Sequence, residues 1–135
     1  MMGFHDFYRL SSHAVIVNEQ QQVLLLKATY ADLAWGLPGG GLDVGETMHE
    51  ALLRECREEL GCDITIEYLS GVYYHSMVNS HVFIFRCQIK ADQFIQLSEE
   101  HSEYEWFDFD ELSPTQKLRV EDCFYFNGTV KSRAF

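Results

Sequence analysis

The sequence has 135 residues, 47% of them hydrophobic, and its 21 acidic against 10 basic side chains give a formal net charge of −11. We therefore expect a single domain over residues 1–135 that folds without disulfides or a structural metal, and the lack of a basic cluster argues against stable binding of long nucleic acid. Because no apolar run approaches the ~20 residues that span a bilayer and the N-terminal residues lack the pattern of a signal peptide, we expect a soluble, cytoplasmic protein without a membrane segment.

The first predicted elements are two strands over His13–Lys27, separated by a polar turn at Asn18–Gln21. A loop with three consecutive glycines, Gly39 to Gly41, follows them, and Pro38 stiffens its entry. Glycine lets the backbone turn sharply and approach other groups closely. This loop can therefore direct a backbone carbonyl toward a site beside the next element.

That next element is a helix, which is predicted to begin at about Met48. Thr47 and Glu50 have the spacing of a capping box, and Gly61 fits the position just after a helix end. At about 100° per residue, the apolar side chains of the helix form one stripe that packs on a sheet. The stripe consists of Met48, Ala51, Leu52, Cys56 and Leu60.

Three glutamates, Glu55, Glu58 and Glu59, fall within roughly a 100° arc at the edge of this stripe. Like charges at such spacings destabilise a helix by a few tenths of a kcal/mol per pair. One interpretation is a solvated helix face that Arg54 and Arg57 partly neutralise. The other is a cage for hard divalent cations, which prefer oxygen ligands, and the glycine loop in front of the helix favours it.

Strands also follow the helix. They are predicted over Asp63–Ser76, as two short strands with a break near Ser70–Gly71, over Ser80–Lys90 and over Glu103–Phe109. A short helix is predicted over Asp110–Leu118, with Pro114 in its first turn, and residues 121–135 show no clear period. Strands before and after a central helix predict a layered fold of the mixed α/β or α+β class.

The segment Gly40–Cys62 resembles the Nudix box, G-x5-E-x7-R-E-U-x-E-E-x-G-U, in which U is a bulky aliphatic residue. All seven fixed positions match, and Cys56 and Cys62 stand at the two U positions, where cysteine packs as a small buried hydrophobe. With residue frequencies near 7%, a chance match at one start point has a probability on the order of one in 10⁸. The chain is thereby identified as a member of the Nudix hydrolase family (MutT-like), which implies a mixed β-sheet sandwiched between helices.

The resemblance also implies a reaction, the hydrolysis of a phosphoanhydride bond in a nucleoside diphosphate linked to another group, with Mg²⁺ or Mn²⁺ as cofactor. Such an ion neutralises phosphate charge and lowers the pKa of bound water. Arg54 is implied to orient a neighbouring glutamate, and Glu46, at the helix start, is interpreted as structural because a carboxylate there suits the helix dipole. The implied metal ligands in the box are Glu55, Glu58, Glu59 and the Gly39 carbonyl.

A second acidic segment lies over Leu97–Phe109. Several Nudix proteins have a further glutamate before the last core strand, in an "EH" pair six residues ahead of a tryptophan, and Glu100, His101 and Trp106 match this pattern. The resemblance implies that Glu100 is a catalytic base or an additional metal ligand. Glu103 is the alternative residue in this segment, and Glu55 is the alternative base within the helix. The segment could also be a polar surface loop without a catalytic role.

The aromatic side chains and histidines elsewhere in the sequence give weaker evidence for a functional role. Trp35, Tyr73, Tyr74 and Phe83 could stack on a base, but aromatic residues in strands are more often core. The histidines His13, His75 and His81 lack partners at ligand spacing and are interpreted as ordinary.

The substrate is expected to be a small nucleotide-type molecule, with nucleoside triphosphates and nucleotide sugars both open. Met77 and Val78 stand where ADP-ribose enzymes tend to have a proline, and Asn79 and Ser80 where dinucleoside polyphosphate enzymes tend to have a tyrosine. A Nudix-fold module that binds nucleotides without cutting them is the alternative function, but the complete box favours the enzyme. The oligomeric state is not determined by the sequence, and a homodimer is compatible with it.

Overall fold

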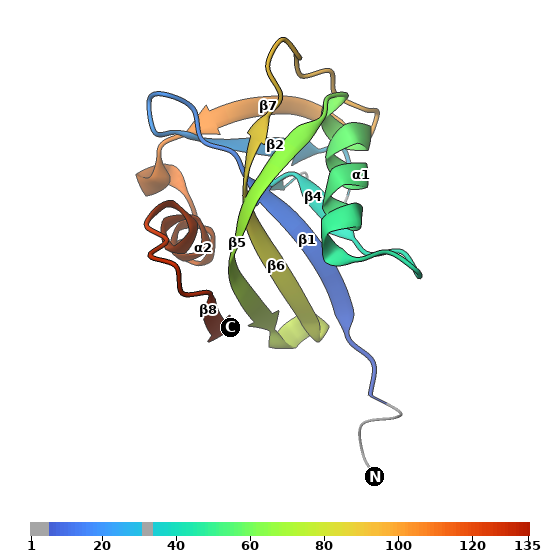
Figure 1. Ribbon diagram of the computed structural model, residues 1–135, viewed down its shortest axis with the longest axis vertical. Coiled ribbons are helices and arrows are strands. Elements are labelled where there is room, and N and C mark those ends of the chain that lie inside the picture. The colour runs from blue at the N-terminus through green and yellow to red at the C-terminus, as the bar shows by residue number, and fades with distance from the viewer. Residues whose placement is uncertain (1–5, 31–33) are drawn as a thin grey trace.

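The computed structural model describes residues 6–30 and 34–135. Two α-helices and eight strands occur in this part of the chain (Figure 1). The helices are α1 (Met48–Leu60) and α2 (Pro114–Phe124). The strands are β1 (Arg9–Val15), β2 (Val23–Ala28), β3 (Trp35–Gly36), β4 (Gly39–Gly41), β5 (Ile64–His75), β6 (Ser80–Ile89), β7 (His101–Phe107) and β8 (Lys131–Ala134).

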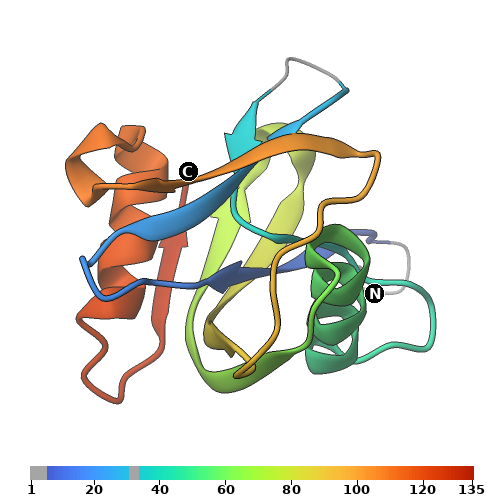
Figure 2. The same cartoon turned by 90° about the horizontal axis from the view of Figure 1, so that it is seen from above.

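Across the described residues the strands form two sheets, with the orders β4-β1-β6-β5-β8 and β3-β2-β7. The five-stranded sheet is mixed, because β1 is parallel to β6 and β5 to β8, whereas β5 and β6, and β1 and β4, are antiparallel. The two helices lie on opposite sides of this sheet, and β2 and β7 cross over one end of it (Figures 1 and 2). The predicted α+β fold, with a mixed sheet between helices, is confirmed.

Both faces of the five-stranded sheet are buried. Successive side chains of a strand point to opposite faces, so Ala14 and Phe85 join the core under α1, whereas Val15 and Ile84 join the core under α2. All four side chains are fully buried. None of the helices in residues 6–30 and 34–135 is long and apolar enough to cross a membrane.

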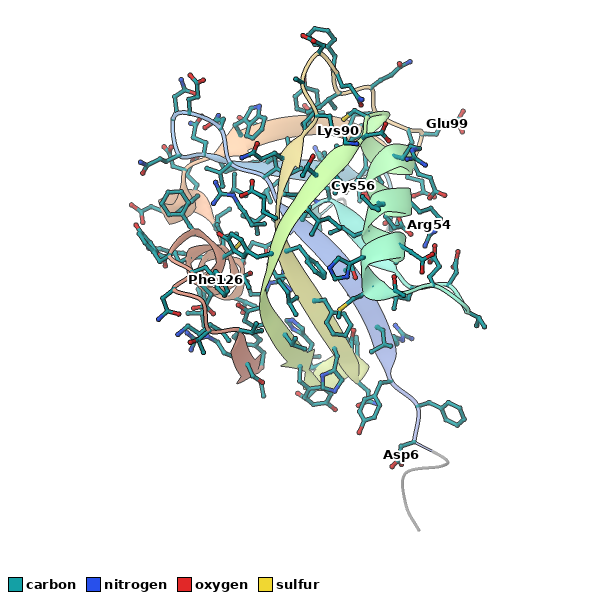
Figure 3. All side chains as sticks on the ribbon, in the orientation of Figure 1. Asp6, Arg54, Cys56, Lys90, Glu99 and Phe126 are labelled. Atoms are coloured by element: carbon teal, nitrogen blue, oxygen red, sulfur yellow. The ribbon has the colours of Figure 1, made fainter. Side chains whose placement is uncertain are left out.

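Helix α1 has the predicted limits, caps and buried stripe. Thr47 and Glu50 cap its start reciprocally, and Gly61, with φ of 65°, takes the left-handed conformation after its end. The predicted stripe faces the core, with Met48 partly buried and the other four residues fully buried. Figure 3 shows Cys56 on the side of α1 toward the sheet and Arg54 on the outer side.

Several element boundaries differ from the prediction. Strand β5 is continuous over 12 residues, so the predicted break at Ser70–Gly71 is wrong. The irregularity there is a shift in register between Leu69 and Gly71, and the Ser70 hydroxyl donates to the Ile84 carbonyl, which keeps the segment in the sheet. Strand β7 begins at His101, two residues before the predicted Glu103–Phe109 strand.

Short elements were not predicted. The glycine loop contains β4, which pairs antiparallel with β1 and places Gly39 opposite His13. The tail contains β8, which runs parallel to β5. Helix α2 extends to Phe124, beyond the predicted Leu118. Strands of two to four residues carry too few side chains to show an alternating pattern, so their partners in the sheet determine them.

Candidate active site

The glycine strand β4 lies directly against α1. Gly39 has φ of 138°, and a Cβ atom there would overlap the carbonyl oxygen of Ser12. A Cβ atom on Gly40 would stand 2.6 Å from the carboxyl carbon of Glu55. Only a residue without a side chain allows this approach, so the run of glycines brings the backbone onto the helix carboxylates.

Glu59 is the most buried of the box glutamates, with 4% of its surface exposed. Its carboxylate accepts hydrogen bonds from the Gly39 N–H, at 3.2 and 3.4 Å, and has no cationic partner among the described residues. Burial is the main cause that raises its pKa to about 8, and the charges of Glu55 and Glu100 act in the same direction. A buried carboxylate without a cation is costly to ionise, so this position favours a positively charged ligand.

Arg54 connects the acidic groups on the outer side of α1. Its guanidinium donates to both carboxylate oxygens of Glu46, at 2.7 and 2.9 Å, and to Glu55 at 2.9 Å. It also reaches Glu58 at 3.3 Å and the Gly41 carbonyl at 3.1 Å. Arg54 holds the pKa of Glu46 down to about 2. The bidentate pair fixes the guanidinium of Arg54, which through its other hydrogen bonds links α1 to the glycine strand and holds one oxygen of Glu55.

The three helix carboxylates differ in environment. The side chain of Glu58 is 59% exposed, whereas that of Glu55 is 17% exposed. Burial raises the pKa of Glu55, and Arg54 opposes this shift. Within residues 6–30 and 34–135, no three His, Cys, Asp or Glu side chains already have the spacing of a metal site. Arg54 contacts two of the three carboxylates, so the predicted cage consists of neighbouring oxygen donors that are not yet arranged in a metal-coordination geometry.

The donor set nevertheless fits a hard divalent cation. Carboxylate and carbonyl oxygens are the ligands that Mg²⁺ and Mn²⁺ take in proteins, and the buried Glu59 carboxylate lacks a positive charge beside it. Gly39 contacts the site through its N–H, and its carbonyl as a ligand stays a prediction.

The comparison with known families agrees with this geometry. The NUDIX domain family matches residues 7–125. The chain belongs to the Nudix hydrolase family. A relative, the putative 8-oxo-dGTP diphosphatase of Bacillus subtilis (strain 168), is 30% identical over 119 residues, which cover 85% of this chain and 79% of the relative.

Solved structures share the Nudix fold. That of a UDP-X diphosphatase superimposes with a TM-score of 0.80 at 23% identity, covering 96% of this chain and 68% of the other. An ADP-ribose pyrophosphatase from Streptococcus suis 89-1591 gives a TM-score of 0.77 at 20% identity, covering 96% and 100%. Identities this low establish the fold alone. The names of these proteins point to different substrates, so membership of the family leaves the substrate open.

Glu100 lies near the Nudix box, whereas Glu103 points elsewhere. The carbonyls of Glu99 and Glu100 accept hydrogen bonds from the Thr29 side chain and backbone N–H, at 3.1 and 2.9 Å. The charge of Glu100 contributes to the raised pKa of both Glu55 and Glu59. Glu103 instead pairs with Lys27 at 3.4 Å. Of the two downstream candidates, the structure brings Glu100 to the box.

A cavity of about 240 Å³ adjoins the box, and Gly39 and Glu59 form part of its wall. His13, Trp35 and His101 also line it. The sequence interpretation missed His13 and treated Trp35 as core. No local pattern marks His13, because its place depends on the pairing of β1 with the glycine strand.

Proposed function

We propose that this Nudix hydrolase is a metal-dependent pyrophosphohydrolase, which cleaves a phosphoanhydride bond in a nucleoside diphosphate linked to another group. The observation that carries the proposal is the buried Glu59 carboxylate, held by the Gly39 N–H and without a cationic partner among the described residues. Nucleoside triphosphates and nucleotide sugars are the first substrate classes to test.

The proposed ligands of Mg²⁺ or Mn²⁺ are the carboxylates of Glu55, Glu58, Glu59 and Glu100 and the carbonyl of Gly39. When bound, the ion would neutralise phosphate charge and make the attacking water more acidic. The negative charge of the box is then compatible with an anionic substrate.

Side chains of this protein would position the catalytic carboxylates and accept the proton of the attacking water. Arg54 holds one oxygen of Glu55 at 2.9 Å, and the whole carboxylate lies beside Gly40. Glu100, on an exposed segment near the box, is the proposed acceptor of the proton from water. Glu55 is the alternative base, because burial raises its pKa and so makes it a better proton acceptor.

The test is a substrate panel of nucleoside triphosphates, nucleotide sugars, ADP-ribose and dinucleoside polyphosphates, assayed with Mg²⁺ and with Mn²⁺. Release of phosphate, pyrophosphate or a nucleoside monophosphate from one class supports the enzyme and identifies the bond that is cut. Tight binding of a nucleotide without any product would instead support the alternative, a Nudix-fold binding or regulatory module.

A further inference from the structure

We infer that His13 selects the substrate, by accepting a hydrogen bond at Nε2 from an exocyclic amino group of the nucleotide's base. The inference rests on the proposed function, because it takes the cavity beside Glu59 to be where the nucleoside part binds. It adds a base preference, which neither the Nudix box nor the family comparison specifies.

The cavity has the dimensions and lining for one ring system. Its volume of about 240 Å³ lies below the ~300–1,000 Å³ of sites for drug-sized ligands. Gly39 and Glu59 form one part of its wall, and Trp35, Leu37 and Tyr30 contribute apolar and aromatic surface. A base held among these side chains would have its phosphates near the box carboxylates, and aromatic walls favour flat rings.

The hydrogen bond of His13 to the backbone determines its tautomer. Its Nδ1 atom lies 3.2 Å from the carbonyl oxygen of Leu37. A carbonyl oxygen only accepts, so Nδ1 carries the proton. In the neutral ring, Nε2 then has the lone pair and is an acceptor. The backbone of the segment before the glycine strand thus presets which kind of group His13 recognises.

The acceptor is available to a ligand. Among the described residues, only Nδ1 of the His13 ring has a hydrogen-bond partner, so Nε2 has none, and His13 lines the cavity. His101, which lines the same cavity, has a buried Nδ1 atom that also lacks a partner in this part of the chain. Polar atoms in a cavity wall gain most from a ligand that supplies the complementary group.

An acceptor distinguishes an amino group from a keto oxygen or a hydrogen at the same ring position. A keto oxygen facing Nε2 would leave two acceptors opposed, and a hydrogen on carbon would leave Nε2 unsatisfied. Each case costs about tenfold to a hundredfold in affinity, the range expected for an unpaired buried group. The amino-bearing members of the pairs adenosine and inosine, guanosine and inosine, and cytidine and uridine are therefore the candidates.

Two substitutions separate the acceptor from the rest of the ring. His13→Asn retains a side-chain N–H that can reach the Leu37 carbonyl but has no atom at the position of Nε2. His13→Gln places an oxygen acceptor close to that position. Thermal unfolding of both variants identifies any general loss of folding, and the comparison of the two variants does not depend on their absolute stability.

The experiment measures binding of AMP, IMP, GMP, CMP and UMP at pH 8 in EDTA, by calorimetry and by ¹⁵N spectra of the histidine rings. For the parent, we expect a preference of tenfold or more for the amino-bearing member of at least one pair, and a shift of the His13 Nε2 signal on binding. His13→Asn should lose this preference, and His13→Gln should largely keep it. Equal binding within every pair, no binding, or an unchanged preference in His13→Asn would overturn the inference. Base-selective binding without turnover of any member of the substrate panel would contradict the proposed function alone, and turnover without base preference would contradict the inference alone.

Discussion

Replacing Gly40 with alanine should impair catalysis while the fold survives. The new Cβ atom would stand 2.6 Å from the carboxyl carbon of Glu55 and 2.7–2.8 Å from its two oxygens. Ordinary contact begins near 3.4 Å, so the carboxylate must move by roughly 0.8 Å to reach normal van der Waals separation. The backbone at Gly40 does not have a positive φ, so alanine is compatible with its conformation.

That displacement acts on the group that Arg54 positions at 2.9 Å. A misplacement of about 1 Å in a catalytic site can cost on the order of 10²-fold in rate, so we expect Gly40→Ala to lower kcat/KM by about that factor. The assay is metal-supported turnover of the best substrate in the panel, measured together with the melting temperature.

Gly41→Ala is the matched control, one residue along the same strand. Its Cβ atom would meet nothing closer than the Leu10 carbonyl at 3.8 Å. Both variants share the entropic effect of alanine on the unfolded chain, which is at most about 1 kcal/mol. Equal activity in the two variants would refute the claim that close approach of the backbone positions Glu55.

Three further outcomes are expected. In metal-free protein, Glu59→Gln should melt no lower than the parent, because a neutral amide replaces a buried carboxyl group that is costly to ionise. Added Mg²⁺ should then raise the melting temperature of the parent more than that of the variant; equal shifts would contradict this. Glu100→Gln should lower kcat much more than it raises KM, whereas Glu103→Gln should change little; the reverse result would move the base by three residues. Asp122 accepts hydrogen bonds from Arg133 and Tyr73, and Arg133 is the main cause that lowers its pKa, so Asp122→Asn should cost about 1.5–3 kcal/mol at pH 7.

The lowered pKa of Asp122 determines how its contribution to stability depends on pH. A carboxyl whose pKa is lower in the folded than in the unfolded state stabilises the fold above its unfolded pKa, near 3.8, and this contribution is lost as pH falls through the folded pKa. Urea unfolding of parent and variant should therefore differ at pH 7 and converge toward pH 3. A difference that stays constant over this range would show that the ion pair does not contribute.

Helix α1 and the box could be predicted from the sequence because their determinants are local. The capping pair, the C-terminal glycine and the apolar stripe lie within 15 residues of one another, and each has a direct structural consequence. The resemblance to the family implied that Arg54 orients a neighbouring glutamate, and in the structure its partners are Glu46, which precedes the helix, and Glu55.

The features that the sequence did not predict depend on contacts between distant segments. Strand β5 stays continuous through Ser70 because the hydroxyl bonds to β6, and a single-strand pattern does not contain its partner. His13 reaches the cavity through the pairing of β1 with β4, and its tautomer depends on Leu37, 24 residues away. The substrate-side residues of the site are therefore less predictable from sequence than its acidic helix.

The proposed cation site is tested most directly by the metal dependence of anhydride hydrolysis, measured side by side for the parent and Glu59→Gln. We expect that parent turnover disappears in EDTA and returns with excess Mg²⁺, and that turnover is lower by orders of magnitude in Glu59→Gln at every Mg²⁺ concentration. Turnover that persists in EDTA, or a Glu59→Gln variant as active as the parent, would contradict the claim that the box carboxylates hold the catalytic cation.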